Sequence, residues 1–409
     1  MSPTKILKAC CKLFVLTLAG VLLYFNASFY FSPDFEDAGN GMYNEDVYHQ
    51  LRHLKGEMHN GAASEMQQLF PEGHLFMNAL YGLAWADLVV NLNGAPSDEE
   101  TFVRAEAEQE ITWALAEMDS PQGRRIFQEK LPLPYGVFYR GWSNYLRAKQ
   151  VEITPTDQRT PVSKARLQAE CDTIADAFDA AEGPYLPSYY DGIWPADNVL
   201  AIASLAAYDR MFSTFRYKKT VNDWLAKVKA NLDERTGLIP HVWYPGQRPQ
   251  GARGSSQSLM LSLLPEIDAS FATEQFAGYE QHFVTSRLSL PGIREYPTGI
   301  DKSGDIDSGP VIWGVGGAAS VVGQRAAAAN GQEDLYLGLR NSLEAFGVAH
   351  TLLGKKKYLF GQLPMADAFI AWGNAAEKVP AKGRFPKPWA IHLLSLLFLL
   401  LLGWVVWKL

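Results

Sequence analysis

Two long stretches without a charged residue lie at the ends of the chain. Residues 13–31 form the first, and residues 389–407 form the second. At about 1.5 Å per residue, each is long enough to cross a hydrocarbon core of roughly 30 Å. Between them, apolar residues recur with helical spacing, and strand-like alternation is scarce. The pattern predicts a helical domain, residues 43–377, between an N-terminal transmembrane anchor (1–32) and a C-terminal transmembrane helix (388–409).

The predicted domain divides into twelve helices, which Gly- and Pro-rich segments separate. Ser97 followed by three acids, and Thr160 followed by Pro161, are typical helix starts. The predicted helices span residues 45–69, 74–92, 98–118, 135–150, 161–181, 196–212, 217–231, 255–267, 269–284, 311–329, 333–350 and 364–375.

The links between these helices alternate in character. Links before even-numbered helices, such as 183–195, 237–254 and 290–310, are rich in Gly, Pro, aromatic and charged residues, whereas links after them are short. Six helical hairpins closed into a ring would bring the rich loops to one face, where they would line a pocket. The sequence therefore predicts an all-α fold, an (α/α)6 barrel or six-hairpin toroid. A helical solenoid and a two-part bundle are the alternatives.

Composition excludes several functions. The chain has 37 Lys and Arg against 44 Asp and Glu, a net charge of −7 that offers no basic field to nucleic acid. Only Cys171 lies in the predicted domain, so no internal disulfide framework forms there. The sequence has no HExxH, paired CxxC, GxSxG or P-loop motif, and we expect neither a metal nor another cofactor.

Charged residues beside the two spans bear on membrane orientation. Three lysines precede the first span and three acids follow it, which places the N-terminus in the cytoplasm and the domain on the periplasmic or extracellular side of a bacterial-type inner membrane. Four basic residues, from 378 to 387, lie on the domain side of the second span and argue for the reverse. We give the first span more weight because it usually dominates topology. A cleaved signal peptide is the alternative for this segment, but residues 26–28 make a poor cleavage site.

Carboxylates gather in the loops before two predicted helices. Residues 189–198 contain two acids where a helix begins, and residues 294–310 contain four more. Carboxylates this close together cannot all ionise freely, and a raised pKa suits a general acid. The candidate catalytic residues are Asp197, Asp305, Asp307, Glu295 and Asp191. The alternatives are a first-turn acid favoured by the helix dipole for Asp197, and a calcium-like loop for residues 301–307.

Aromatic and polar residues of the same loops suggest ligand binding. Arg253 lies just before a predicted helix N-terminus, which is a natural anion site. An aromatic run such as 135–145 usually lies in a core, and a single His is more often structural than catalytic. Glu72 is either a helix cap or a pocket acid. The candidate substrate-binding residues are Tyr139, Trp142, Trp194, Asn198, His241, Trp243, Tyr244 and Arg253.

Three of these segments also carry a resemblance. They are Tyr-x-Gly-x-x-Asn-Tyr at 139–145, Asp-Asn at 197–198 leading into 204–210, and the stretch 305–319 entering a helix. Over residues 43–375 the chain resembles the linalool dehydratase/isomerase-like proteins and, more broadly, the six-hairpin glycosidase-like toroids. The resemblance implies the (α/α)6 fold. The linalool enzyme's pocket uses cysteines in the segment matching 194–203 and a His where this chain has Trp142, so the resemblance does not transfer that activity.

We expect a glycosidase-like hydrolase that acts on an envelope or extracellular carbohydrate, because sugars stack on aromatic rings beside paired acids. One alternative is a lyase or isomerase for a small alcohol, with a closed apolar cavity. The other is a non-enzymatic membrane scaffold or glycan-binding component with membrane-protein partners. In the enzyme, Asp305 or Asp307 would face Asp197 across the mouth of the barrel.

Overall fold

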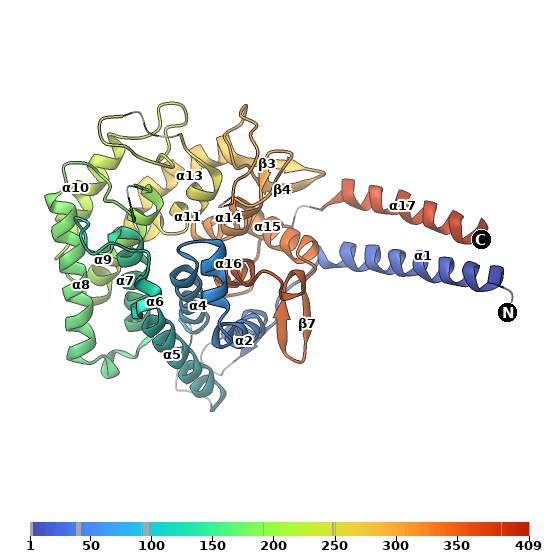
Figure 1. Ribbon diagram of the computed structural model, residues 1–409, viewed down its shortest axis with the longest axis horizontal. Helices are drawn as coiled ribbons and strands as arrows, with labels where there is room; N and C mark the ends of the chain where they lie inside the picture. Colours follow the sequence, from blue (N-terminus) through green and yellow to red (C-terminus); the bar gives the residue numbers. More distant parts are fainter. Residues whose placement is uncertain are drawn as a thin grey trace.

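The computed structural model describes residues 3–37, 42–90, 92, 98–190, 192–247, 249, 251–306, 308–385 and 387–408. Within these ranges the chain is mostly helical, and its strands form four short antiparallel hairpins. The domain and the two terminal helices are shown in Figure 1.

The buried inner layer of the domain consists of helices that are packed on most of their sides. In α4, for example, every residue except Phe76 is buried. Each inner helix packs against the next one in the chain, and α16 packs back against α4. In the described part of the chain these helices are α4 (Gly73–Val89), α7 (Gly136–Ile153), α9 (Pro195–Phe212), α11 (Gly254–Leu261), α14 (Gly317–Ala329) and α16 (Pro364–Asn374).

The outer helices alternate with the inner ones along the chain, and each packs against an inner helix. They bury one face only, as apolar residues at helical spacing dictate. They are α2 (Glu45–His59), α5 (Asp98–Asp119), α8 (Pro161–Ala180), α10 (Lys218–Lys229), α13 (Ala269–Phe283) and α15 (Glu333–Phe346). Shorter helices are α3 (Ala62–Leu69), α6 (Pro121–Arg124), α12 (Leu264–Ile267), η1 (Thr156–Gln158) and η2 (Leu359–Gly361).

The predicted helices are present, with corrections to several boundaries. The range 45–69 divides into α2 and α3 at Gly61, whose φ of 97° belongs to the left-handed region. The range 255–267 divides into α11 and α12. The predicted start at 311 is wrong, because the helix begins at Gly317. Thr160 caps α8 by accepting a hydrogen bond from the Ser163 amide, as expected, whereas Ser97 lies outside the described residues.

The strand pairs were not predicted in the sequence. Three of the pairs precede inner helices, and β1 pairs with β2 ahead of α2. The strands are β1 (Phe35–Asp37), β2 (Met42–Asn44), β3 (Val284–Arg287), β4 (Leu290–Ile293), β5 (Val311–Ile312), β6 (Val315–Gly316), β7 (His350–Leu352) and β8 (Lys355–Lys357).

The terminal helices α1 (Pro3–Ser28) and α17 (Trp389–Lys408) leave the same side of the domain and lie side by side, with both chain ends at their far tips (Figure 1). Asn26 joins them: its amide nitrogen donates to Ser395 Oγ at 2.9 Å, and its amide oxygen lies 2.6 Å from His392 Nδ1. Both helices are long and apolar enough to cross a membrane, which confirms the two apolar terminal helices expected from the sequence.

Candidate functional site

The loops that precede inner helices contact one another, so their polar residues share one region. The Tyr189 hydroxyl donates to Glu72 at 3.4 Å, which joins the loop before α9 to the loop before α4. The Trp243 amide donates to the Ile193 carbonyl at 3.0 Å, which joins the loop before α11 to the loop before α9. The candidate acids of this region fall into two clusters.

The Asp197 cluster consists of Glu72, Ser188, Tyr189, Trp194 and Asp197. Pro195 begins α9, which places Asp197 in the first turn of this helix. Its side chain is buried, and the Ser188 hydroxyl, which accepts from the Trp194 amide at 3.3 Å, lies close to it. Burial raises the pKa of Asp197 to about 7, and the nearby Glu72 carboxylate adds to the rise against the opposing effect of Ser188. A carboxyl of this kind holds its proton up to neutral pH and can donate it to a ligand.

A pair of stacked rings lies just before Asp197 in the chain, and the Asp197 amide donates to the Trp194 carbonyl. The rings of Tyr189 and Trp194 are nearly parallel, with centroids 5.1 Å apart. A Cβ on Gly192 would come within 2.1 Å of the Trp194 indole, so only glycine leaves room for the ring there. The local sequence Gly-Ile-Trp-Pro therefore fixes the aromatic surface and the helix start together.

A cavity of about 560 Å³, open to solvent, is lined by chain neighbours of the Asp197 cluster and by none of the five cluster residues themselves. It reaches Pro71 and Tyr190, the chain neighbours of Glu72 and Tyr189. Tyr190 is exposed, although its φ of 48° is unusual for a residue other than glycine. The cavity is also lined by the amide and guanidinium side chains of Gln67, Gln68, Gln122 and Arg125. Amides beside an exposed aromatic ring suit a ligand rich in hydroxyl groups.

The Arg253 cluster consists of His241, Arg253, Ser255, Glu295 and Asp305. Arg253 donates from Nε to Glu295 at 2.7 Å, and its two terminal nitrogens donate to Asp305 at 2.8 and 3.1 Å. Ser255 donates to the same oxygen of Glu295 at 2.8 Å. Because the Arg253 guanidinium already donates to both carboxylates, this residue is not the free anion site that its position before α11 suggested.

The environments of these acids differ. Burial raises the pKa of Glu295, although Arg253 and Ser255 oppose the rise, and its Oε2 is buried without a hydrogen-bond partner among the described residues. Hydrogen bonds from Arg253 hold the pKa of Asp305 well below its ordinary value. Burial lowers the pKa of His241 to about 3, so the imidazole is neutral at physiological pH. Within this cluster, Glu295 is the carboxyl that retains its proton most readily.

Several candidate binding residues make contacts that hold the fold. The Tyr139 hydroxyl donates to Asp119 at 2.7 Å, and Asn198 bonds both the amide and the carbonyl of Leu186. Trp142 is fully buried and packs against the rings of other inner-helix residues.

The remaining candidates lie nearer the loops or beyond the described residues. The Trp243 ring contacts Tyr185, and Tyr244 lies half-buried in the following turn. Asp191 and Asp307 lie outside the described residues. The opposition of Asp305 and Asp197 across a barrel mouth remains a prediction.

The cavity that reaches Pro71 and Tyr190 is lined by residues that were not predicted from the sequence. Gln67 and Gln68 lie at the end of α3, one residue before the Phe-Pro-Glu-Gly loop, and this pair of amides was the only signal in the local sequence. Gln122 lies in the short helix α6, and its carbonyl accepts a hydrogen bond from Gln67, a contact between residues 55 positions apart that no local pattern reveals. Among the described residues, no three His, Cys, Asp or Glu side chains are placed to hold a metal ion.

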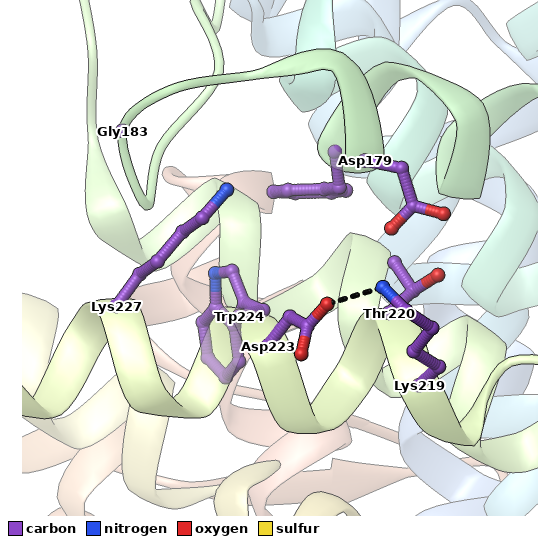
Figure 2. A pocket seen from close by; sticks show the side chains of 8 residues that line it. Asp179, Gly183, Lys219, Thr220, Asp223, Trp224 and Lys227 are labelled. Carbon is purple, nitrogen blue, oxygen red and sulfur yellow. Dashed lines mark hydrogen bonds and ion pairs between the residues drawn. The ribbon is translucent and has the colours of Figure 1, made fainter.

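A smaller hollow, of about 110 Å³, lies between the outer helices α8 and α10 (Figure 2). Its two lysines are already engaged: Lys227 donates to the Ala181 carbonyl, and Lys219 pairs with Asp223, both at 2.6 Å. We assign no ligand to it.

No family model matches this sequence, and no curated protein matches it. The geometry of the two clusters and the adjoining cavity is therefore the basis for assigning a function.

Proposed function

We propose that this protein is a membrane-anchored, glycosidase-like enzyme that uses acid/base carboxylates on a carbohydrate of the cell envelope or exterior. One observation carries the proposal: Asp197 is a buried carboxyl, with a pKa raised to about 7, beside the stacked rings of Tyr189 and Trp194. This combination supplies a proton donor and a surface for a sugar ring in the same place.

Glycoside hydrolysis needs an acid for the leaving oxygen and a second carboxylate as base or nucleophile. Asp197 is the acid of the proposed pair. Glu72 is close enough to raise the pKa of Asp197, so it is the nearest candidate for the second role. In this scheme Asp197 protonates the glycosidic oxygen as its bond to the anomeric carbon breaks. The second carboxylate either activates water or forms the new bond to that carbon.

The cavity favours a carbohydrate over a small apolar alcohol. A lyase of the linalool type would enclose its substrate in an apolar cavity. The cavity that reaches Pro71 and Tyr190 is open and is lined by Gln67, Gln68 and Gln122. An extended glycan fits such a groove, with Tyr190 available for stacking.

The helix packing supports an (α/α)6 barrel as the proposed architecture. Inner helices contact their successors, α16 contacts α4, and the outer helices alternate with them along the chain. This is the order of a six-hairpin toroid, the fold of the glycosidase-like proteins that the sequence resembles. In the same proposal, α1 and α17 cross the membrane and hold the domain on its periplasmic or extracellular side.

The test is to assay the full chain in nanodiscs against a panel of glycans, with products detected by mass spectrometry. We expect Asp197→Asn to lower turnover by about 100-fold or more, because a general acid typically contributes 10²–10⁴-fold. Asp157→Asn, at an exposed position outside both clusters, is the matched control and should leave turnover unchanged. Full activity in Asp197→Asn would refute the assignment. Conversion of linalool to myrcene without glycan cleavage would favour the lyase.

A further inference from the structure

Three hairpins of this protein have bulky apolar residues where a tight turn normally has Asn or Gly. The first central residues of the turns are Leu288, Trp313 and Leu353, with φ values of 50°, 51° and 52°. Positive φ brings an L side chain close to its own backbone, so these residues are strained there. Two-residue turns with positive φ at both positions strongly prefer Asn-Gly or Asp-Gly. The backbone conformation is therefore unfavourable for the residue type at all three turns.

The same residues are exposed to solvent in the isolated chain. Leu353 is 88% exposed and Trp313 is 67% exposed. Their neighbours Leu352 and Ile312 are 67% and 64% exposed. We call these four residues and Leu288 the hairpin tips. Neither the fold nor the turn chemistry explains large apolar side chains at these points.

The hairpins that carry the tips lie beside the base of the terminal helices. The Arg287 side chain donates to the Trp313 carbonyl at 3.2 Å, so the β3–β4 and β5–β6 turns are adjacent. Leu290, which begins β4, packs with Phe29 of α1 and Ile391 of α17. In Figure 1 the β3–β4 hairpin points toward the side on which α17 leaves the domain.

The third hairpin also adjoins α1. The Tyr24 hydroxyl of α1 bonds the Ala349 carbonyl just before β7. Figure 1 shows the β7 hairpin beside the base of α1. Phe346, also exposed, contacts the Phe25 ring of α1. The apolar surface is therefore continuous with the two membrane-length helices.

We infer that the hairpin tips dip into the lipid bilayer that α1 and α17 cross, and fasten the domain against the membrane surface. This inference rests on the membrane anchoring in the proposed function. Leucine and tryptophan at exposed turns match the boundary between headgroups and acyl chains, where Trp is enriched. Arg287, Lys355 and Lys357 lie beside the tips and suit anionic headgroups.

The occupant is a bilayer rather than another protein because the hairpins that carry the tips pack beside the two helices that lead into it. A protein partner would need to share this face with the headgroups. Three tips and two helices at separated points would also hold the domain in one orientation, so the loops before the inner helices would keep a fixed relation to the membrane.

The test is spin-label depth measurement on the full chain in vesicles of phosphatidylcholine and phosphatidylglycerol. Single labels replace Leu353 and Trp313 in a chain whose Cys10 and Cys11 are serine, with the buried Cys171 left in place. Val162 and Phe215 give matched control labels, because they are equally exposed apolar residues. They lie at α8 and α10, at the other end of the domain from α1 and α17 (Figure 1). A label at Leu396 reports on α17 itself.

We expect labels at 353, 313 and 396 to be accessible to oxygen and shielded from a water-soluble nickel complex. Labels at 162 and 215 should show the opposite. Labels at 353 and 313 in water, with 396 in lipid, would overturn the docking and leave the anchoring intact. A label at 396 in water would overturn the anchoring. Labels at 353 and 313 shielded from both reagents would mean a protein covers the tips, which also overturns the lipid inference.

Discussion

Asp197 and Asp305 have opposite pKa shifts because their surroundings differ. Burial raises the pKa of Asp197 to about 7, whereas the guanidinium of Arg253 lowers that of Asp305. A protonated acid and an ionised one are the two states that acid/base chemistry needs. Their residue types alone would have suggested equal roles.

The raised pKa of Asp197 also predicts how stability depends on pH. The folded state holds the proton up to about pH 7, while the unfolded chain releases it near pH 4. The stability that this group contributes is therefore fully present below pH 4 and is lost as pH rises toward 7. Asp197→Asn, which cannot ionise, should become more stable than the wild type by a few kcal/mol across this window. Denaturant unfolding at a series of pH values measures the difference.

Asp157→Asn is the control for that experiment and should show no such trend. Asp367, whose pKa is also raised to about 7 by burial, affects the wild type and both variants equally and cancels. A constant difference between Asp197→Asn and the wild type from pH 4 to 7 would contradict the raised pKa.

The sequence could identify Asp197 but not the partners of Arg253. An acid two residues after Trp-Pro, at the start of an apolar helical run, is a local signal. The contacts of Arg253 with Glu295 and Asp305 span 42 and 52 positions and depend on the tertiary fold. The sequence also could not assign Trp142. A ring at a helix start fits either a core or a pocket, and only the packing of the neighbouring helices decides between them.

At the scale of elements, Arg253 joins the loop before α11 to the loop before α14. We expect Arg253→Ala to cost about 3–5 kcal/mol of unfolding free energy, because it leaves the buried Glu295 carboxyl without its cation. Adding Glu295→Gln should recover part of that loss, since an amide carries no charge to bury. Urea unfolding of the single and double variants gives the coupling.

Lys219→Ala is the control for this cycle. Lys219 forms an ion pair with Asp223, but both side chains are exposed and solvent screens the pair, so its loss should leave the unfolding free energy nearly unchanged. Additive effects of Arg253→Ala and Glu295→Gln would show that the two side chains do not act as a pair.

Helices were predictable and hairpins were not, for a physical reason. Apolar residues at a 3.6-residue period specify helices over long stretches, and the predicted cap at Thr160 is present. The hairpins β3–β4, β5–β6 and β7–β8 have strands of two to four residues and turns without Asn-Gly, so the usual signal is missing. The apolar residues that replace the usual turn signal are the ones that we propose to contact lipid.

At the scale of the whole molecule, the terminal helices form an antiparallel pair. The domain-proximal ends of α1 and α17 meet at Asn26 and His392, and both chain ends lie at the far tips (Figure 1). Side-chain hydrogen bonds between apolar helices stabilise their pairing by roughly 0.6–2 kcal/mol. If the pair crosses a membrane, both termini must emerge on the side opposite the domain.

The helix pair also predicts the membrane topology of the chain. Basic residues lie at both ends of the pair: Lys5, Lys8 and Lys12 at the far end, and four residues from 378 to 387 near the domain. The two groups of basic residues favour opposite orientations of the pair. The first span usually dominates topology, and it places both termini in the cytoplasm. Reporter fusions at each terminus should both read cytoplasmic, and a membrane-impermeant thiol reagent should label Val162→Cys from outside. Termini on opposite sides would break the helix pair, whereas two external termini would keep the pair and reverse its orientation.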